Sequence, residues 1–581
     1  MSGRIVDYIS QYAETALLST LENIAGAKDL LIEPTLIKSL DNIASLKKLR
    51  ATGVSKLFRL EGVLPANSSR KCVFLVKGSL SSVKQVASII SSSPNGREFY
   101  LLGLPRLTAA AITLLESEGV FGMINLIPIP VSLIAIEDDV ASLENETFFR
   151  DVFVHDDHSP LSSVALSLCQ IEEFAKIGQV FLIGDTSRSV FNQWKLLRKG
   201  STASESKITI ESLVIFSRDA DYVSLMSTQM NYSAILDDLF GIQNGKCVIP
   251  KSVTKKEERQ INFKEPNETL SSIRDKHISS VFGVLSSESK KFMGNVSGGT
   301  PQSISGLKHF VNNELSAVTK LRSALSLHVS ICEEISQRRG HDFDVVRAAE
   351  QNLLQGTDVK NTIELIKDCI CSEKPWDVSL RLLCLLSLVQ DGIPHGYMEN
   401  LRTFFLHQYG HHYLAILQRL EKLEILYEAP PVMGTPQGKG GSMISKMATS
   451  ASLLGLKESA FMSKSRKLGL IQSEKDRRTR THSAGYVFND LYVPLIAKLL
   501  ESINSGNCDQ LSKVLGGALT SERLHQAPLL ASAKNVLVYF VGGASFGELA
   551  ALRLVSKLQG FNIFFAATDL CGGSRFLNKL I

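Results

Sequence analysis

The residues with the most suggestive chemistry lie in the segment GGASFGE, Gly542–Glu548. Gly543, Ser545 and Gly547 have the G-x-S-x-G spacing of a nucleophile elbow, between an apolar run and a helical pattern as that turn requires. An elbow serine acts with a histidine base, which in that fold follows the serine in the chain. The last histidine here is His525, and none of the 36 residues after Ser545 is a histidine. The sequence therefore argues against a hydrolase.

The same segment contains part of a phosphate-binding loop. Gly542 and Gly547 have the G-x-x-x-x-G spacing, but Lys and Ser or Thr should follow, and the chain has Glu548 and Leu549 there. A carboxylate in place of the lysine would repel a phosphate, so nucleotide binding is disfavoured. A structural interpretation explains these residues better, because glycines allow a tight turn and Glu548 suits the first turn of a helix, where the dipole favours an anion.

Histidines and cysteines that could bind a metal ion occur without the partners that a site needs. His407 and His411 are one helical turn apart, with His412 adjacent, but no third ligand stands at a usual spacing. His155 and His158 lie in a polar stretch that is typical of a loop. The nine cysteines are scattered and form no C-x-x-C pair, which argues against disulfides and zinc and fits a reducing compartment. We expect no catalytic residue, no metal ion and no cofactor.

Composition places the chain among multidomain globular proteins. Its 581 residues are 44% hydrophobic, and at roughly 100–200 residues per domain they predict several domains. A formal charge of +5 is close to neutral for this length, whereas a dedicated nucleic-acid binder concentrates more basic charge. Residues Met1–Tyr12 do not resemble a secretory signal. The longest uncharged stretch, Gly119–Ile136, contains Pro128 and Pro130, which suit short buried strands better than a membrane span. We expect a cytoplasmic protein without nucleic-acid partners.

Short apolar runs alternate with helical patterns in two separate parts of the chain. This alternation is typical of parallel sheets whose strands are joined by helices. Residues 268–428, between the two parts, are mostly helical in pattern. The sequence predicts an α/β frame with an inserted all-α domain, in which the last strands return to complete an earlier sheet. The predicted strands are Cys72–Val76, Phe99–Leu102, Val180–Ile183, Leu213–Phe216, Val536–Val541 and Ile563–Ala567, and helices between them include Leu80–Ile90 and Ala109–Ser117.

Two helices and a loop characterise the helical part. Val378–Val389 is apolar nearly all round, which predicts a buried helix. Tyr413–Tyr427 places Leu417 and Leu420 on one apolar stripe. Residues 428–485 begin with a Gly- and Pro-rich run and carry ten basic residues against four acidic ones. We predict a mobile, solvated loop there, and the alternative is contact with anionic lipid or an acidic partner.

The most distinctive segment is LVIFSRDADYVSLMSTQMNYSAILDDLFGI, Leu213–Ile242. It resembles the signature of the SM (Sec/Munc) family of SNARE regulators, in which a buried strand precedes Asp-Arg-x-x-Asp and then a helix with a tyrosine and paired acids. Two positions depart from that pattern, because Ser217 stands at the first Asp and Leu225 near a frequent proline. The matching residues are Arg218, Asp221, Tyr232, Asp237 and Asp238.

Other segments extend the resemblance along nearly the whole chain. Lys28–Gly62, Leu382–Ile393 and Phe404–Leu414 are similar to the vacuolar-sorting class C branch of the family, and the C-terminal half looks most like its B-type paralogue. The C-terminal VLVYFVGGASFGELAALRLV is similar to a family motif whose residues here are Gly542, Gly543 and Glu548. We predict that these motif residues are structural. In particular, Arg218 and Asp221 follow a buried strand, and a buried charge needs a partner.

The resemblance implies a three-domain arch that is not an enzyme. Residues 1–148 would form α/β domain 1, and residues 149–245 and 486–581 the two parts of α/β domain 2, with parallel sheets in both. Residues 246–485 would form helical domain 3, including the basic loop 428–485. SM proteins hold SNARE helices between domains 1 and 3 and promote their assembly for membrane fusion. A groove can bind such an amphipathic helix through its i, i+3, i+4 and i+7 side chains.

The vacuolar-sorting branch also implies partners and a place. Its members act in vesicle docking and fusion, in a tethering complex peripheral to late endosome and lysosome membranes. The expected partners are endosomal SNARE helices and a VIPAR-type α-solenoid scaffold subunit that holds domain 3. The competing function is a structural adaptor that binds the scaffold but no SNARE. The residues whose aromatic and apolar mix suits the scaffold interface, or alternatively an internal core, are Phe404, Phe405, Leu406, Tyr409, Tyr413 and Leu414.

Overall fold

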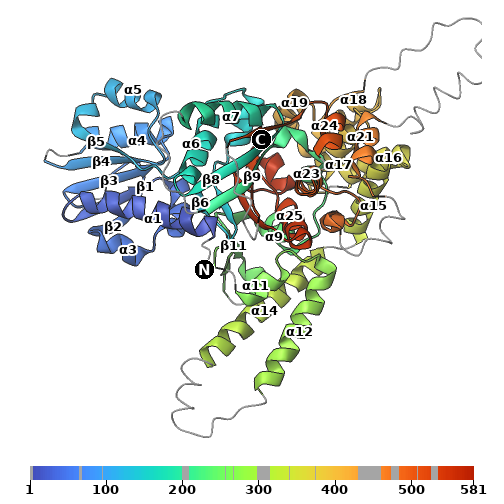
Figure 1. Ribbon diagram of the computed structural model, residues 1–581, viewed down its shortest axis with the longest axis horizontal. Helices are drawn as coiled ribbons and strands as arrows, with labels where there is room; N and C mark the ends of the chain where they lie inside the picture. Colours follow the sequence, from blue (N-terminus) through green and yellow to red (C-terminus); the bar gives the residue numbers. More distant parts are fainter. Residues whose placement is uncertain are drawn as a thin grey trace, which may run out of the picture.

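A computed structural model describes residues 4–581, apart from 65–67, 94–95, 199–207, 256, 266, 297–314, 339–340, 373, 430–458, 473–482, 507 and 525–533. Figure 1 shows a smaller α/β part on the left, a larger sheet in the middle and a helical part on the right, with two long helices projecting below. The two long helices are α12 (Ile278–Val296) and α14 (Leu315–Arg338). The predicted fold class, an α/β frame with an inserted helical domain, is confirmed.

The first sheet has five parallel strands in the order β2-β1-β3-β4-β5. Its central strands are apolar runs because helices cover both faces: α1 and α2 pack on one face, and α4 and α5 on the other. The strands are β1 (Lys28–Ile32), β2 (Val54–Arg59), β3 (Lys71–Val76), β4 (Glu98–Gly103) and β5 (Ile124–Pro128). The helices are α1 (Ile5–Asn23), α2 (Ile37–Ile43), α3 (Leu46–Ala51), α4 (Leu80–Ser91) and α5 (Ala109–Ser117).

The central sheet has seven strands in the order β13-β8-β9-β14-β15-β7-β6, and only the two outer strands run antiparallel to their neighbours. The last strands of the chain thus lie inside the sheet, between β9 and β7, as predicted. The strands are β6 (Ile134–Ala135), β7 (Val140–Ser142), β8 (Ala175–Ile183), β9 (Ile208–Ser217), β13 (Leu519–Arg523), β14 (Asn535–Val541) and β15 (Asn562–Ala567). The associated helices are α6 (Leu161–Glu172), α7 (Asp185–Arg198), α8 (Val223–Met226), α9 (Tyr232–Phe240), α23 (Leu495–Asn504), α24 (Cys508–Leu515), α25 (Phe546–Gln559) and α26 (Gly573–Lys579).

The first two domains share more chain than a boundary at residue 148 would allow. Strands β6 and β7 precede residue 148 but pair in the central sheet. Helix α1 also contributes to both cores, with Ile5 and Ile9 against the central sheet and Leu17 and Leu21 against the first. An apolar helix stripe that continues past one sheet can be buried only by a second sheet, so α1 joins the two.

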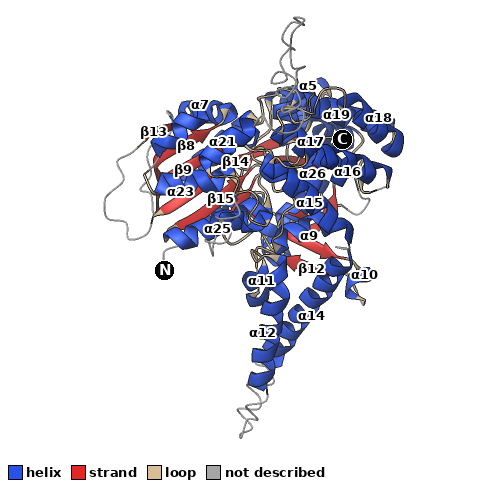
Figure 2. Cartoon of the chain, turned by 90° about the vertical axis from the view of Figure 1, so that its right-hand side faces the viewer, coloured by secondary structure: helices blue, strands red, loops and turns tan. Residues whose placement is uncertain are grey.

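The helical part begins with a small antiparallel sheet, which the prediction of a helical domain from residue 246 did not include. Its strands β10 (Ile242–Gln243), β11 (Lys246–Ile249) and β12 (Arg259–Asn262) pair in sequence order. The predicted buried helix at 378–389 is confirmed, since α17 (Trp376–Val389) is buried on most of its surface. The remaining helices are α10 (Lys251–Thr254), α11 (Glu268–Ile273), α15 (His341–Gln355), α16 (Val359–Cys371), α18 (Met398–Tyr409), α19 (Leu414–Lys422) and α21 (Ala460–Leu468). Figure 2 shows α15, α16, α17 and α18 to one side of the central sheet, with α10 and α11 below them beside β12.

One segment of the predicted basic loop 428–485 is a packed helix. Ser459 caps α21 by accepting a hydrogen bond from the Met462 amide, and Met462 and Leu468 are buried. Met462 and Leu468 lie on one side of this helix, and the loop prediction overlooked this apolar side because the surrounding residues are basic. Residues 430–458 and 473–482 lie outside the described residues. Among the helices that the structure describes, none is long and apolar enough to cross a bilayer.

Candidate functional site

The two motifs singled out in the sequence meet at the carboxyl edge of the central sheet. Strands β9 and β14 are parallel neighbours, with Ser217 opposite Val541. Arg218 follows β9 and Gly542 follows β14. These two residues, more than 300 positions apart in the sequence, are therefore adjacent in space. In α/β sheets this edge commonly binds ligands, but here side chains of the chain itself fill it.

Arg218 and Glu548 form a buried ion pair at this edge. The Arg218 Nη2 donates to both carboxylate oxygens of Glu548, at 2.9 and 3.0 Å, and the two side chains are 1% and 0% exposed. The Arg218 Nη1 donates to the backbone carbonyl of Asp221, 3.0 Å away. Burial alone would lower the pKa of Arg218, but the nearby charges of Glu548 and Asp221 raise it, so the guanidinium stays charged.

Glu548 also closes the N-terminus of α25. Its carboxylate accepts hydrogen bonds from the Ser545 amide and hydroxyl at 3.0 and 2.9 Å, and the Glu548 amide donates to the Ser545 hydroxyl. This is a capping box, in which two unpaired helix amides are satisfied reciprocally. The Ser545 side chain is therefore buried and committed to the cap, an arrangement that does not suit a nucleophile.

The glycines of the C-terminal motif make room for the pair. Gly542 has φ +97°, and a Cβ there would lie 2.8 Å from the Arg218 Cβ and 2.9 Å from the Phe153 ring. Gly543 also has a positive φ, +103°. A Cβ on Gly547 would lie 2.6 Å from the Gln229 Oε1. That oxygen accepts a hydrogen bond from the Gly547 amide.

Asp221 and Asp237 hold neighbouring backbone in place. The Asp221 carboxylate accepts from the Ser224 amide and hydroxyl and from the Leu495 amide, 3.1 Å away on the returning chain. The Asp237 carboxylate accepts from the Gly572 amide at 2.7 Å and from Arg575 at 2.6 Å. Both acids therefore join the part of domain 2 before the helical insertion to the part after it.

Tyr232 and Asp238 face the inserted helical domain. The Tyr232 hydroxyl is hydrogen-bonded to the His328 Nδ1 of α14 at 2.8 Å, and both residues are buried. Burial lowers the pKa of His328 to about 4, so this imidazole is neutral near pH 7. Asp238 lies 3.9 Å from the guanidinium of Arg381 on α17. The motif helix α9 thus contacts two helices of the insertion.

Several charged residues at the domain junctions were not identified from the sequence. Arg381 donates to the Met226 carbonyl and the Thr228 hydroxyl at 3.1 and 3.0 Å, which docks α17 on domain 2. Arg553 of α25 binds the carboxylates of Glu137 and Asp139. A signal was present for Arg381, because it interrupts the apolar run of α17, and a charge in such a run must find a buried partner. Helix α25 carries Glu548 and Lys557 as well, so Arg553 did not stand out in the same way.

Among the described residues, one group of acids is close enough together to hold a metal ion. Ligand atoms of Glu137, Asp138 and Asp139 lie within 4.8 Å of one another. However, Arg274 and Arg553 already form ion pairs with them. The arrangement therefore suits an internal ion-pair network.

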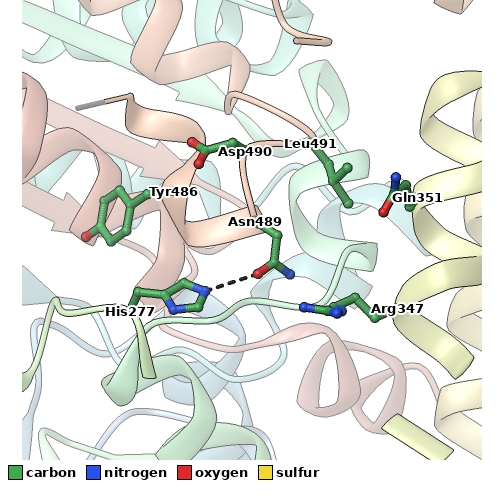
Figure 3. Close-up of a pocket in the computed structure, with 7 residues that line it drawn as sticks. All are labelled: His277, Arg347, Gln351, Tyr486, Asn489, Asp490 and Leu491. Carbon is green, nitrogen blue, oxygen red and sulfur yellow. Dashed lines mark hydrogen bonds between the residues drawn. The ribbon is translucent and has the colours of Figure 1, made fainter. Parts of the chain in front are cut away.

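A polar pocket marks the junction of the helical part with the returning chain (Figure 3). It measures about 440 Å³ and lies between the start of α12, helix α15 and residues 486–491. The His277 Nε2 and the Asn489 Oδ1 are hydrogen-bonded across it at 3.1 Å, and Arg347 faces them from α15. Its lining residues are His277, Arg347, Gln351, Tyr486, Asn489, Asp490 and Leu491.

The predicted scaffold-interface residues divide between surface and core. Phe404 is 44% exposed, whereas Phe405 is 0% exposed and packs on Tyr409 and Tyr413. Phe405 is therefore a core residue, which is the alternative that the sequence left open, because α18 turns that side chain inward. The Tyr409 hydroxyl donates to the Lys374 carbonyl at 2.7 Å, so Tyr409 has an internal role as well. Leu406, Tyr413 and Leu414 are half-buried.

A surface groove lies on the Leu406 side of α18. It measures about 550 Å³ and is bounded by α18, α19 and residues 427–428. Its lining is mixed, since Met398, Leu406 and Tyr427 alternate with charged residues. The charged and polar lining residues are Glu399, Arg402, Thr403, Glu421 and Glu428.

Comparisons with known proteins agree with this arrangement. The model of the Sec1 family matches residues 28–579. The vacuolar protein sorting-associated protein 33B of Mus musculus is 27% identical over 98% of this chain and 96% of its own length. The corresponding protein 33A of Rattus norvegicus is 26% identical over 100% and 98%.

Solved structures share the fold over nearly the whole chain. The Unc18–syntaxin 1 complex of Monosiga brevicollis matches with a TM-score of 0.62 at 16% identity, over 98% of each chain. The SM protein Vps45 in complex with the Qa SNARE Tlg2 matches with a TM-score of 0.60 at 15% identity, over 98% and 97%. The buried motif residues, the discontinuous central sheet and the match over residues 28–579 lead to one conclusion: this chain belongs to the Sec1 family, the family of the SM proteins.

Proposed function

We propose that this chain regulates SNARE assembly in vesicle docking and fusion on the endosome and lysosome pathway. It acts in a tethering complex with a VIPAR-type α-solenoid scaffold subunit and is peripheral to late endosome and lysosome membranes. The observation that carries the proposal is the family match over residues 28–579. Fold similarity to an Unc18 solved with syntaxin 1 and a Vps45 solved with Tlg2 supports it.

Exposed apolar side chains on two parts of the molecule support SNARE binding. Phe282 on α12 is 66% exposed, and Leu46 on α3 is 46% exposed. Helices α3 and α12 both lie on the lower side of the molecule in Figure 1. A SNARE helix offers an apolar stripe that such side chains can contact, and we propose that Leu46 and Phe282 take part.

Binding of a purified Qa-SNARE cytosolic domain tests this proposal. We expect Phe282→Asp and Leu46→Asp each to raise the dissociation constant about tenfold or more, because a charge replaces an apolar contact. Leu558→Asp is the matched control, since Leu558 is 54% exposed on α25. No measurable SNARE binding by the wild-type chain, either alone or with the scaffold subunit, would refute this part of the proposal.

The groove lined by Leu406 is the proposed contact for the scaffold subunit. Its apolar and charged lining residues together have the mixed character of an interface. Leu406→Asp should abolish co-purification with the VIPAR-type subunit, because it places a charge in the groove. Phe121→Asp, at a phenylalanine of domain 1 that is 42% exposed, should leave it unchanged. Equal binding by both variants would place the interface elsewhere.

The same two assays separate the competing function. A structural adaptor would bind the scaffold subunit through the groove lined by Leu406 and would bind no SNARE, either alone or with the scaffold subunit. Retained scaffold binding together with absent SNARE binding would therefore favour the adaptor over the SNARE regulator.

A further inference from the structure

The chain segment that leaves the first sheet packs in three of the four hydrophobic cores. Residues 129–142 form this segment, which we call the connector. Ile129 and Val131 pack in the core of the first sheet, Leu133 packs on one face of the central sheet, and Ile136 packs on the other. The connector therefore has little freedom to move without disturbing the contact between the two sheets.

The tip of the connector carries three consecutive acids, and Arg553 of α25 binds two of them. The Arg553 guanidinium lies 2.6 Å from Glu137 and 2.6 and 2.7 Å from the two oxygens of Asp139. It also lies 2.8 Å from Asp275. Arg553 and Glu137 have side chains that are 7% and 1% exposed, so these interactions are shielded from water.

Arg274 completes the cluster from the base of the projecting helices. It lies between α11 and α12, four residues before Ile278 begins α12. Its guanidinium lies 2.7 Å from Asp138 and 3.4 Å from Glu137, and its side chain is 10% exposed. The backbone around it is fixed to domain 2, since Ser233 donates to the Arg274 carbonyl.

These six residues have more negative than positive charge. We call Glu137, Asp138, Asp139, Arg274, Asp275 and Arg553 the junction cluster: it has four carboxylates and two guanidinium groups. Arg4 adds a third cation at the edge, 3.4 Å from Asp138. Removing one arginine would leave acids facing one another with too few partners, and repulsion would then act on every element that contributes an acid.

We propose that the junction cluster couples the base of the α12 and α14 pair to the connector, so that loss of its ion pairs loosens both segments together. The coupling passes through side chains of three elements that are far apart in sequence: the connector, the α11–α12 junction and α25. Loss of Arg274 would leave Asp138 and Glu137 with fewer cations and would also remove a contact at the base of α12. The inference rests on the ion pairs alone and is independent of SNARE binding.

Hydrogen–deuterium exchange of the full chain tests the coupling. Arg274→Met should raise the exchange rates of peptides from residues 134–142 and 268–285 together, each by about tenfold, while peptides from β3 stay unchanged. Arg338→Met is the matched control. Arg338 pairs with Glu334 on α14 and its side chain is 47% exposed, so we expect no change in either region.

A milder variant keeps the test decisive if Arg274→Met does not fold. Asp138→Asn removes one charge at a side chain that is 30% exposed, and it should raise exchange in the same two regions by about threefold. Faster exchange at 268–285 with unchanged exchange at 134–142, in either variant, would overturn the proposal. Equal rates in the wild type and both variants would overturn it as well.

Discussion

Removing Arg218 should destabilise the central sheet strongly. Arg218→Ala leaves the Glu548 carboxylate, 0% exposed, without its cation. Breaking a buried ion pair by deleting one partner costs about 3–5 kcal/mol. Glu548 keeps its hydrogen bonds to Ser545, which limits the loss. We therefore expect the free energy of unfolding to fall by about 4 kcal/mol.

The two tryptophans of the chain allow the effect to be assigned to one part of the molecule. Trp194 is fully buried against the central sheet, and Trp376 lies in α17 of the helical part. In a Trp376→Phe background, the fluorescence of Trp194 reports unfolding of the central sheet alone. With a slope of about 3 kcal/mol per molar urea, Arg218→Ala should lower the midpoint by about 1–2 M.

A surface ion pair and a double variant provide the controls. Arg338→Ala breaks a partly exposed pair and should change the free energy of unfolding by less than about 1 kcal/mol. Replacing both buried partners, as in Arg218→Met with Glu548→Leu, should recover much of the loss because no charge is left unpaired. A midpoint that Arg218→Ala leaves unchanged, or losses that simply add in the double variant, would refute the reasoning.

Three further outcomes follow from the structure. Burial lowers the pKa of His328 to about 4 in the folded state, whereas its unfolded pKa is about 6.5. The stabilisation from the neutral imidazole is therefore complete above about pH 6.5 and falls by about 3 kcal/mol as the pH drops to 4. The stability difference between the wild type and His328→Asn, measured by urea unfolding, should shrink as the pH drops from 6.5 to 4, and parallel pH profiles would contradict this. Gly542→Ala should lower stability by about 2 kcal/mol more than Gly560→Ala, because the control position has a positive φ but no atom within 4 Å of the added Cβ; equal urea midpoints would contradict the steric argument. Ser545→Ala should cost about 1 kcal/mol through loss of the helix cap, and esterase turnover that this change abolished would restore the nucleophile interpretation.

Local patterns predicted six interior strands, whereas the interior strands β1 and β7 and the edge strand β13 were not named. The six apolar runs named in the sequence are all strands, because a strand covered on both faces is apolar throughout. The edge strand β13 has the sequence LTSER, which looks like a loop. It forms a strand because β8 offers it an unpaired edge. Whether such a segment forms a strand therefore depends on the strand that it can pair with.

The interface residues show the same limit on a helix. The sequence treated Phe404 and Phe405 alike, either as interface residues or as internal core. The structure exposes the first and buries the second, since successive helix positions point about 100° apart. Which side of α18 faces inward depends on α17 and α19, and therefore on packing that a periodicity argument sees only as a stripe.

The sequence by itself determined the class of the fold, the family and the identity of the motif residues, because these depend on local hydrophobic periodicity and on residue types at fixed spacing. Tertiary structure alone decided which motif residues are partners. Arg218 and Glu548 are 330 residues apart, and they meet because β14 inserts beside β9. The insertion brings two lone charges to one sheet edge from which water is excluded. There, each charge is stable only against the other, and that requirement joins the two parts of the domain.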